Sequence, residues 1–85
     1  MKVTFASDAW VDYLYFQEKD KKALKKINAL IKDLQRNPNE SGIGKAEKLG
    51  YELSGYFSRR IDLEHRMVYK ITKDSIEIAQ LRFHY

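Results

Sequence analysis

The sequence predicts an α+β fold, in which two helices pack on an antiparallel sheet, because three patterns follow one another along the chain. Residues 2–5 alternate in polarity as a short strand does, and two helical periodicities follow them. The segments after residue 46 are rich in Tyr, Phe, Ile, Val and Leu and are separated by turn residues, which indicates strands joined by hairpins. Helices and strands that are segregated in this way are typical of an α+β domain.

The composition limits the chain to one small domain, and its basic charge favours an anionic partner. Its 85 residues suffice for a single core, so residues 1–85 are expected to form one domain. The absence of cysteine excludes disulfides and thiolate metal sites and favours a reducing, cytoplasmic location. No segment reaches the roughly 18 consecutive apolar residues of a membrane-spanning helix, so no membrane association is expected. The net charge of +4 favours an anionic partner such as nucleic acid.

Two helices are predicted in the N-terminal half. Ser7 is a candidate N-cap for a helix from Asp8 to about Gln17. Asp20 is a candidate N-cap for a second helix, which ends at Asn37-Pro38 because the residue before proline disfavours the helical conformation. The apolar stripe of this second helix is the cleanest in the chain and consists of Leu24, Ile27, Leu30, Ile31 and Leu34. Residues 37–46 are then expected to form a loop.

The C-terminal half predicts about four strands, at residues 47–53, 56–61, 65–72 and 75–83. A two-residue turn at Ser54-Gly55 would place Leu49 opposite Arg60. The same turn would place Glu47 opposite Asp62.

The next predicted turn, at residues 62–64, places Arg60 opposite Arg66. Because side chains alternate between the faces of a strand, Glu47 shares a face with these two arginines. The opposite face is expected to pack against the helices, and its residues are Phe57, Ile61, Met67, Tyr69 and Ile71. Two arginines side by side repel each other, so an anion is expected between them. Glu47, a carboxylate of a partner and a phosphate group all fit that description.

The position of His84 depends on the register of the last strand. A two-residue turn at Lys73-Asp74 places Tyr69 opposite Ile78 and puts His84 on the core face, away from Arg66. A single β-bulge in the last strand would reverse this assignment. The sequence leaves both arrangements open.

The inventory of reactive residues favours metal-free cleavage of RNA. The two histidines lie 19 positions apart, without the spacing of a zinc site, and no glycine-rich phosphate loop is present, so neither a metal nor another cofactor is expected. RNA carries its own nucleophile, the 2′-hydroxyl, so the protein must supply only a base, a cation and an acid. Each of the available Glu, Arg, His and Tyr side chains also fits an ordinary surface role.

Several segments together make the chain similar to the YoeB/Txe toxins of the RelE/ParE superfamily. The most specific are LSGYFSRRI at residues 53–61, EHRMVY at residues 64–69 and RFHY at residues 82–85. The resemblance also includes WVDYL at residues 10–14, KKIN at residues 25–28 and GKAE at residues 44–47. It implies a microbial-RNase-like fold and a ribosome-dependent mRNA endoribonuclease that cuts in the ribosomal A site. It further implies a YefM-like antitoxin as partner and a homodimer, for which the aromatic face around Trp10 is the candidate contact.

The resemblance also implies a role for each site residue. Glu47 would be the general base, Arg66 would stabilise the transition-state phosphate with support from Arg60, His84 would be the general acid, and Tyr85 would orient the substrate. The residues expected to set the affinity for RNA are Lys45, Lys48, Arg59 and Arg60.

Two other functions stay open at this point. The ParE branch shares the fold and poisons DNA gyrase, but its members generally lack the Glu, Arg and terminal His-Tyr set. A plain nucleic-acid-binding module, which would contact phosphates through the basic helix face between Lys21 and Lys32, is the other alternative.

Overall fold

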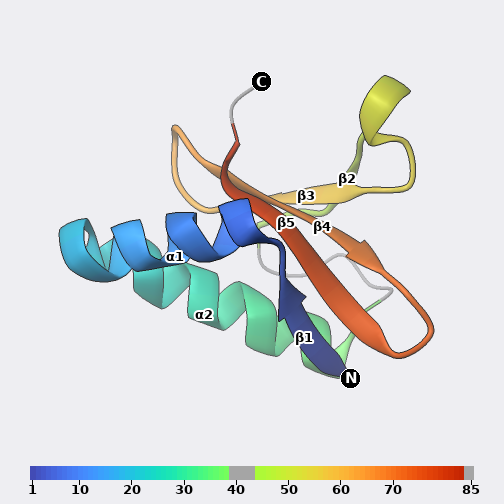
Figure 1. Cartoon of the computed structure of the whole chain (residues 1–85), viewed down its shortest axis with the longest axis horizontal. Helices are drawn as coiled ribbons and strands as arrows, with labels where there is room; N and C mark the ends of the chain where they lie inside the picture. The colour runs from blue at the N-terminus through green and yellow to red at the C-terminus, as the bar shows by residue number, and fades with distance from the viewer. Residues whose placement is uncertain (39–43, 84–85) are drawn as a thin grey trace.

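The structure, a computed structural model, describes residues 1–38 and 44–83. Its elements are β1 (Lys2–Phe5), α1 (Ser7–Lys19), α2 (Lys21–Arg36), β2 (Glu47–Lys48), the 3-10 turn η1 (Tyr51–Leu53), β3 (Phe57–Arg60), β4 (Arg66–Ile71) and β5 (Ser75–Phe83). Both helices lie on one side of a five-stranded sheet, which confirms the predicted α+β fold (Figure 1). None of the helices within the described ranges is long and apolar enough to cross a lipid bilayer.

The sheet has the strand order β1-β5-β4-β3-β2 and is mixed. Strands β2 to β5 form the predicted antiparallel meander. Strand β1 instead pairs parallel to β5, with Lys2 opposite Ser75 and Phe5 opposite Ile78. Parallel neighbours need a long crossover connection, which the rest of the chain supplies here. The first and last strands of the chain are therefore neighbours at one edge of the sheet.

Helix α2 forms as its sequence predicts. The Asp20 side chain accepts a hydrogen bond from the backbone N–H of Ala23 at 3.0 Å, which confirms the N-cap. The helix ends at Arg36, directly before Asn37-Pro38, as expected. Its apolar face meets the sheet, and its buried residues are Ala23, Ile27, Leu30 and Leu34.

Helix α1 differs from the prediction at both ends. It begins at Ser7, and Ala6 occupies the N-cap position without a side-chain hydrogen bond, so the prediction of Ser7 as N-cap is wrong. At its other end the helix reaches Lys19, because the backbone N–H of Asp20 still donates to the Phe16 carbonyl oxygen at 2.9 Å.

The hairpin between β3 and β4 has the predicted register, with Arg60 opposite Arg66 and Phe57 opposite Tyr69. The predicted core face is also confirmed. Ile61, Met67 and Tyr69 are buried against the helices, and Phe57 and Ile71 pack on the core at its margin.

The connection between β2 and β3 is longer than the predicted two-residue turn. Glu47 pairs with Ser58, so the predicted pairs of Glu47 with Asp62 and of Leu49 with Arg60 are wrong. The intervening residues wind into η1, a compact turn that takes up chain the prediction had placed in two long strands. The partner of Glu47 moves by four positions, from 62 to 58, which is an even number. Glu47 therefore keeps the predicted face of the sheet.

The ladder between β4 and β5 contains two register shifts, whereas the sequence had left open a regular strand or a single bulge. The pairing starts with Tyr69 opposite Ile78, as predicted. The two shifts lie between Tyr69 and Val68 and between Val68 and Arg66, and the resulting pairs are Val68–Gln80 and Arg66–Phe83. His84 lies outside the described residues.

A buried charge pair joins α2 to β3. The Arg59 side chain is 0% exposed, and its Nη1 atom donates to Asp33 Oδ2 of α2 at 2.5 Å. Its Nε atom donates to the Tyr69 hydroxyl oxygen at 3.1 Å. Burial by itself lowers the pKa of the Arg59 guanidinium, but the hydrogen bonds to Tyr69 and Asp33 outweigh it, and the net pKa lies above its usual value. Arg59 therefore stays charged inside the core, where its partners satisfy it.

Breaking this charge pair should destabilise the fold. Asp33→Asn leaves the Arg59 guanidinium buried without its counter-charge, so we expect the free energy of unfolding to fall by about 3 kcal/mol. Replacing both partners by apolar residues, in Asp33→Leu with Arg59→Met, should recover much of that loss. Urea denaturation measures all three proteins.

The matched control is Glu77→Gln, which removes a carboxylate that is 45% exposed and lies 4.0 Å from Lys70. It should change the unfolding free energy by less than about 1 kcal/mol. An effect of Asp33→Asn no larger than that of the control would contradict a stabilising role for the buried pair.

Candidate functional site

A hollow of about 360 Å³ opens beside the ends of β3 and β4. Its lining residues are Lys26, Gly44, Lys45, Glu47, Arg60 and Arg66. We call it the basic hollow, because four of these side chains are cationic and only Glu47 is acidic. The sequence predicted that Glu47, Arg60 and Arg66 share a face, and the structure brings them together with Lys45. Such a surface attracts an anion and holds a carboxylate beside it.

Arg66 is the most firmly held residue of the basic hollow. Its side chain is 7% exposed, and its Nη2 atom lies 3.4 Å from Glu47 Oε1. Its Nε atom donates to Ser58 Oγ at 2.8 Å. The Arg66 guanidinium extends from β4, and groups on the two other strands β2 and β3 hold it in place. The Glu47 side chain is 52% exposed, so its carboxylate is open to a ligand.

Arg60 stands directly opposite Arg66 and is exposed to solvent. Like charges at such a position destabilise a sheet, and an anion beside them relieves the repulsion. Glu47, which pairs with Arg66, is one of the counter-charges predicted from the sequence.

Gly44 allows the segment before β2 to approach the end of β3. The backbone N–H of Arg60 donates to the Gly44 carbonyl oxygen at 3.0 Å. Gly44 has φ +78°, and a Cβ atom on it would lie 2.8 Å from the Arg60 carbonyl oxygen. Only glycine fits such a position without a shift of the backbone. The next residue, Lys45, also has a positive φ, of 45°, and it lines the basic hollow.

Two residues of the site were not predicted from the sequence. Ser58 holds Arg66, and strand alternation could have found it, because Ser58 lies two positions before Arg60 on the same face. Lys26 reaches the basic hollow from α2. No local pattern marks Lys26, because it is one of several lysines on the polar side of that helix.

The structure does not bring every predicted residue into the basic hollow. Arg59 faces α2 on the opposite side of the sheet and is fully buried, so the prediction that it binds RNA does not fit this fold. Lys48 is exposed, but it follows Glu47 in β2 and therefore points to the opposite face. His84 and Tyr85 lie outside the described residues.

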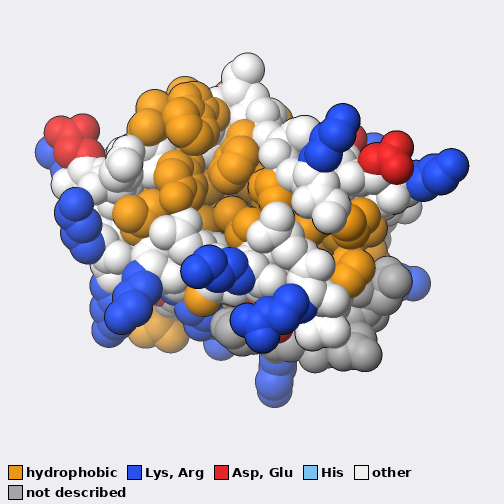
Figure 2. All heavy atoms as spheres, turned by 90° about the horizontal axis from the view of Figure 1, so that it is seen from below, with side chains coloured by type: hydrophobic (Ala, Val, Ile, Leu, Met, Phe, Trp, Pro, Cys, Tyr) orange, Lys and Arg blue, Asp and Glu red, His pale blue; other side chains and the backbone are white. Residues whose placement is uncertain are grey.

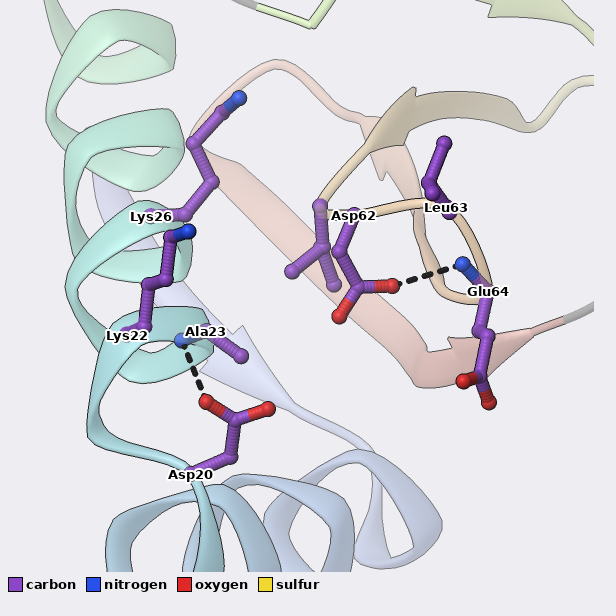
Figure 3. A pocket seen from close by; sticks show the side chains of 8 residues that line it. Asp20, Lys22, Ala23, Lys26, Asp62, Leu63 and Glu64 are labelled. Carbon is purple, nitrogen blue, oxygen red and sulfur yellow. Dashed lines mark hydrogen bonds between the residues drawn. The ribbon is translucent and has the colours of Figure 1, made fainter.

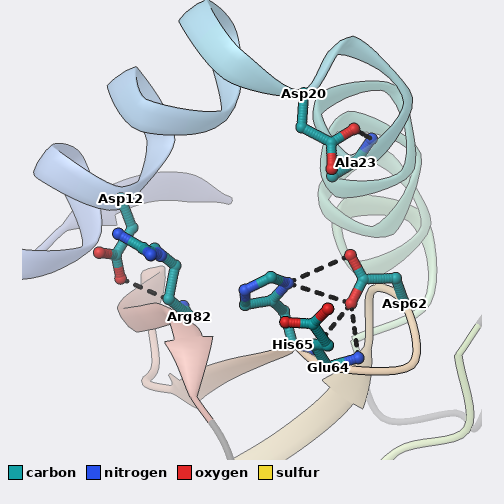
Figure 4. Close-up of polar contacts among 7 residues, drawn as sticks. All are labelled: Asp12, Asp20, Ala23, Asp62, Glu64, His65 and Arg82. Carbon is teal, nitrogen blue, oxygen red and sulfur yellow. Dashed lines mark hydrogen bonds and ion pairs between the residues drawn. The ribbon is translucent and has the colours of Figure 1, made fainter.

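The turn between β3 and β4 is fixed by Asp62. Its carboxylate accepts hydrogen bonds from the backbone N–H groups of Glu64 at 2.8 Å and His65 at 2.7 Å (Figure 4). The His65 ring lies 3.1 Å from the same carboxylate and packs edge-on against Phe16. His65 is thus a structural residue, and the turn sets the register that places Arg60 opposite Arg66. Within the described part of the chain, no group of three or more His, Cys, Asp or Glu side chains is placed to bind a metal ion.

A second hollow, of about 450 Å³, lies between the start of α2 and this turn (Figure 3). Two of its carboxylates serve the fold, because Asp20 caps α2 and Asp62 holds the turn. Lys26 lines both hollows, so it connects this surface with the basic hollow.

The comparisons with known proteins agree with the resemblance seen in the sequence. A family profile described as "YoeB-like toxin of bacterial type II toxin-antitoxin system" matches residues 5–85. The chain belongs to the YoeB toxin family. The Toxin YoeB of Escherichia coli (strain K12) is 55% identical over 85 residues, and the match covers 100% of both chains.

Two solved YoeB structures have the same fold. The YoeB dimer from Staphylococcus aureus is 50% identical and superposes with a TM-score of 0.94 over 100% of this chain and 98% of that chain. The heterotetrameric YoeB-YefM toxin-antitoxin complex from Staphylococcus aureus is also 50% identical, with a TM-score of 0.90 and the same coverage.

The hydrogen bonds of Asp62 predict how this YoeB-family fold responds to acid. Burial raises the pKa of the Asp62 carboxyl, but the hydrogen bonds from His65 and Glu64 outweigh it, and the net pKa lies below the ordinary value of 3.8. A lowered folded-state pKa means that the stabilisation is complete above the unfolded-state pKa and is lost as the pH falls through the folded-state pKa. Below pH 3.8, the melting temperature of Asp62→Asn should therefore fall less steeply than that of the unchanged chain.

Thermal unfolding of both proteins, followed by circular dichroism from about pH 6 to about pH 2, tests this expectation. Asp74→Asn is the control, since it removes an exposed carboxylate from the turn at the far end of β4. Equal acid sensitivity of the unchanged chain and of Asp62→Asn would rule out the contribution of Asp62.

Proposed function

We propose that this protein is a ribosome-dependent mRNA endoribonuclease toxin, which cuts mRNA in the ribosomal A site and thereby stops translation in the cytoplasm. The observation that carries the proposal is the ion pair of Glu47 with Arg66 inside the basic hollow. It places a proton acceptor beside a firmly held cation in cationic surroundings. Cleavage of RNA by its own 2′-hydroxyl requires this combination. Membership of the YoeB toxin family supports the same proposal.

In the proposed reaction, the Glu47 carboxylate takes the proton of the 2′-hydroxyl, and the resulting oxygen attacks the adjacent phosphorus. Arg66, supported by Arg60, stabilises the negative charge of the phosphorane. The bond to the 5′-oxygen then breaks, and that oxygen takes a proton from His84. The products are a 2′,3′-cyclic phosphate and a 5′-hydroxyl. No metal or cofactor is needed, because the nucleophile belongs to the substrate. The roles of His84 and of Tyr85, which would orient the substrate, rest on the family resemblance.

The surroundings of Arg66 support its role in stabilising the transition state. Electrostatic stabilisation is most effective when the charged group is already in place before the reaction. The Arg66 guanidinium meets this condition, since Ser58 and Glu47 hold it and its side chain is 7% exposed. We propose that Ser58 is a positioning residue for Arg66.

Structures of related proteins support a partner and a dimer. The YoeB of Staphylococcus aureus occurs both as a dimer and in a complex with YefM. We propose a YefM-like antitoxin and a homodimer for this chain as well. Figure 2 shows hydrophobic side chains that extend from the upper left across the middle of the face seen from below. The exposed hydrophobic residues of α1 are Trp10, Val11, Leu14 and Tyr15, which remain the candidate dimer contact.

The acid-base assignment predicts three inactive variants. Glu47→Gln, Arg66→Ala and His84→Ala should each lower mRNA cleavage by at least about 100-fold, because each removes a group that acts in the transition state. A reconstituted translation reaction with mapping of the mRNA ends measures this loss, and growth arrest on expression should disappear in parallel. Circular dichroism should show that each variant is folded.

Glu52→Gln is the control for Glu47→Gln, since Glu52 is an exposed carboxylate on the neighbouring turn η1. Full cleavage by all three variants would overturn the assignment. Growth arrest with intact mRNA and with DNA damage would instead favour a gyrase-directed toxin. Binding of RNA without any cleavage would favour a plain nucleic-acid-binding module.

The cations around the basic hollow predict a salt-dependent affinity. Lys26→Ala, Lys45→Ala and Arg60→Ala should each weaken binding to mRNA on the ribosome. Each should also reduce the slope of log affinity against log salt by about 0.7 for every phosphate contact that is lost. Titrations at several salt concentrations measure this slope, while the cleavage rate at saturation should change much less.

Lys73→Ala is the matched control, because Lys73 is exposed in the turn at the other end of β4. Lys48→Ala tests whether the opposite face of β2 also contacts RNA, as the sequence predicts. If the salt slope were unchanged and the cleavage rate were lost, these residues would act in the chemical step rather than in binding.

A further inference from the structure

We infer that Tyr51 of η1 stacks on a base of the mRNA strand that binds in the basic hollow. Tyr51 is 100% exposed, so its ring is not used to pack the fold. An aromatic ring of this kind is a stacking platform for an unpaired base of a single-stranded RNA. The inference rests on the proposed function, because it names a further contact with the same substrate.

The backbone of Tyr51 adopts a conformation that a bulky residue rarely takes. Its φ is +55°, in the left-handed region where glycine and asparagine occur most readily. Within the described part of the chain, the only other non-glycine residue with a positive φ is Lys45, which lines the basic hollow. Lys45 precedes β2 and Tyr51 follows it, so strained residues flank the strand that carries Glu47. Backbone strain of this kind collects at sites that bind ligands.

Hydrogen bonds fix the turn that presents the Tyr51 ring. The backbone N–H of Leu53 donates to the Gly50 carbonyl oxygen at 3.0 Å. The backbone N–H of Ser54 donates to the Tyr51 carbonyl oxygen at 3.0 Å. Figure 1 shows η1 projecting from the ends of β2 and β3, away from both helices. A ring on a turn that is already ordered loses little backbone freedom when it binds a ligand.

Tyr51 follows the acidic residue of the basic hollow, Glu47, by only four positions. Because each residue of an extended chain spans at most about 3.6 Å, the Cα atoms of Glu47 and Tyr51 lie within about 15 Å of each other. An RNA strand with a phosphate beside Glu47 therefore needs only a few more nucleotides to reach η1. This continuity with the basic hollow favours a base of the bound strand over a base of a separate RNA.

The experiment measures the affinity of four variants and the unchanged full-length chain for ribosomes programmed with mRNA. Tyr51→Ala removes the ring and keeps the Cβ atom, whereas Tyr51→Phe keeps the ring. Tyr51→Asn removes the ring and also suits the positive φ. Leu63→Ala is the matched control, since Leu63 is a 98% exposed hydrophobic residue on the turn between β3 and β4.

Two changes in the mRNA complete the design. The unchanged chain first cuts ordinary mRNA, which locates the scissile position, and a 2′-deoxy sugar there then removes the nucleophile, so that affinity is measured without cleavage. A set of such mRNAs carries one abasic nucleotide each, at successive positions near the cut. Thermal unfolding gives the stability of every variant.

We expect Tyr51→Ala and Tyr51→Asn to weaken binding by about 10-fold, while Tyr51→Phe and Leu63→Ala change it by less than about 2-fold. An abasic nucleotide at one position should weaken binding of the unchanged chain to the same extent. The same nucleotide should have no further effect on Tyr51→Ala, because the ring and the base form one contact. Tyr51→Asn should unfold at a higher temperature than the unchanged chain, since asparagine relieves the strain. A merely structural role of Tyr51 would lower that temperature.

Full affinity in Tyr51→Ala, with cleavage of ordinary mRNA by the unchanged chain, would overturn the inference and leave the proposed function intact. So would a loss of affinity in Tyr51→Ala that no abasic position reproduces, because the ring would then contact the ribosome instead of the mRNA. An unchanged chain that does not cleave ordinary mRNA would overturn the proposed function, and the inference with it.

Discussion

The orientation of β3 depends on the buried ion pair between Arg59 and Asp33. This pair requires Arg59 to face α2, and alternation along the strand then requires Ser58 and Arg60 to face the other side. A slip of one residue would expose Arg59 to solvent and turn Arg60 into the core. The charge on the core side of the sheet thus determines which groups are available in the basic hollow.

The two faces of the sheet use their arginines differently. On the core side, Arg59 is fully enclosed, and Asp33 and Tyr69 satisfy it permanently. On the other side, Arg66 is held by Ser58 and meets a carboxylate that is half open to solvent. A cation enclosed by its own protein stabilises the fold, whereas a cation that is held in place beside an open carboxylate can act on a ligand. Burial and partners, rather than residue type, separate these roles.

Part of the site could be predicted because it depends on local rules. The turn at residues 62–64 is short, so the opposition of Arg60 and Arg66 followed from counting residues. The pairing of Glu47 failed because η1 takes up several residues, yet the error was even in number, so its face was right. Arg59 was assigned to RNA binding together with its neighbour Arg60, although alternation along a strand places the two side chains on opposite faces. Its partner Asp33 is 26 positions away in the sequence, where no local pattern reveals it.

The sequence by itself determined the order of helices and strands, the cap of α2, the core face of the central strands and the family of the protein. These features depend on periodicity, turn residues and motifs, all of which act over short stretches of chain. Only the tertiary structure decided that β1 lies parallel to β5, that Lys26 reaches the basic hollow and that Asp12 of α1 accepts a hydrogen bond from the backbone N–H of Leu81. The contact of Asp12 with Leu81 joins residues 69 positions apart. Such contacts depend on how whole elements pack against one another, and packing is a property of the folded chain.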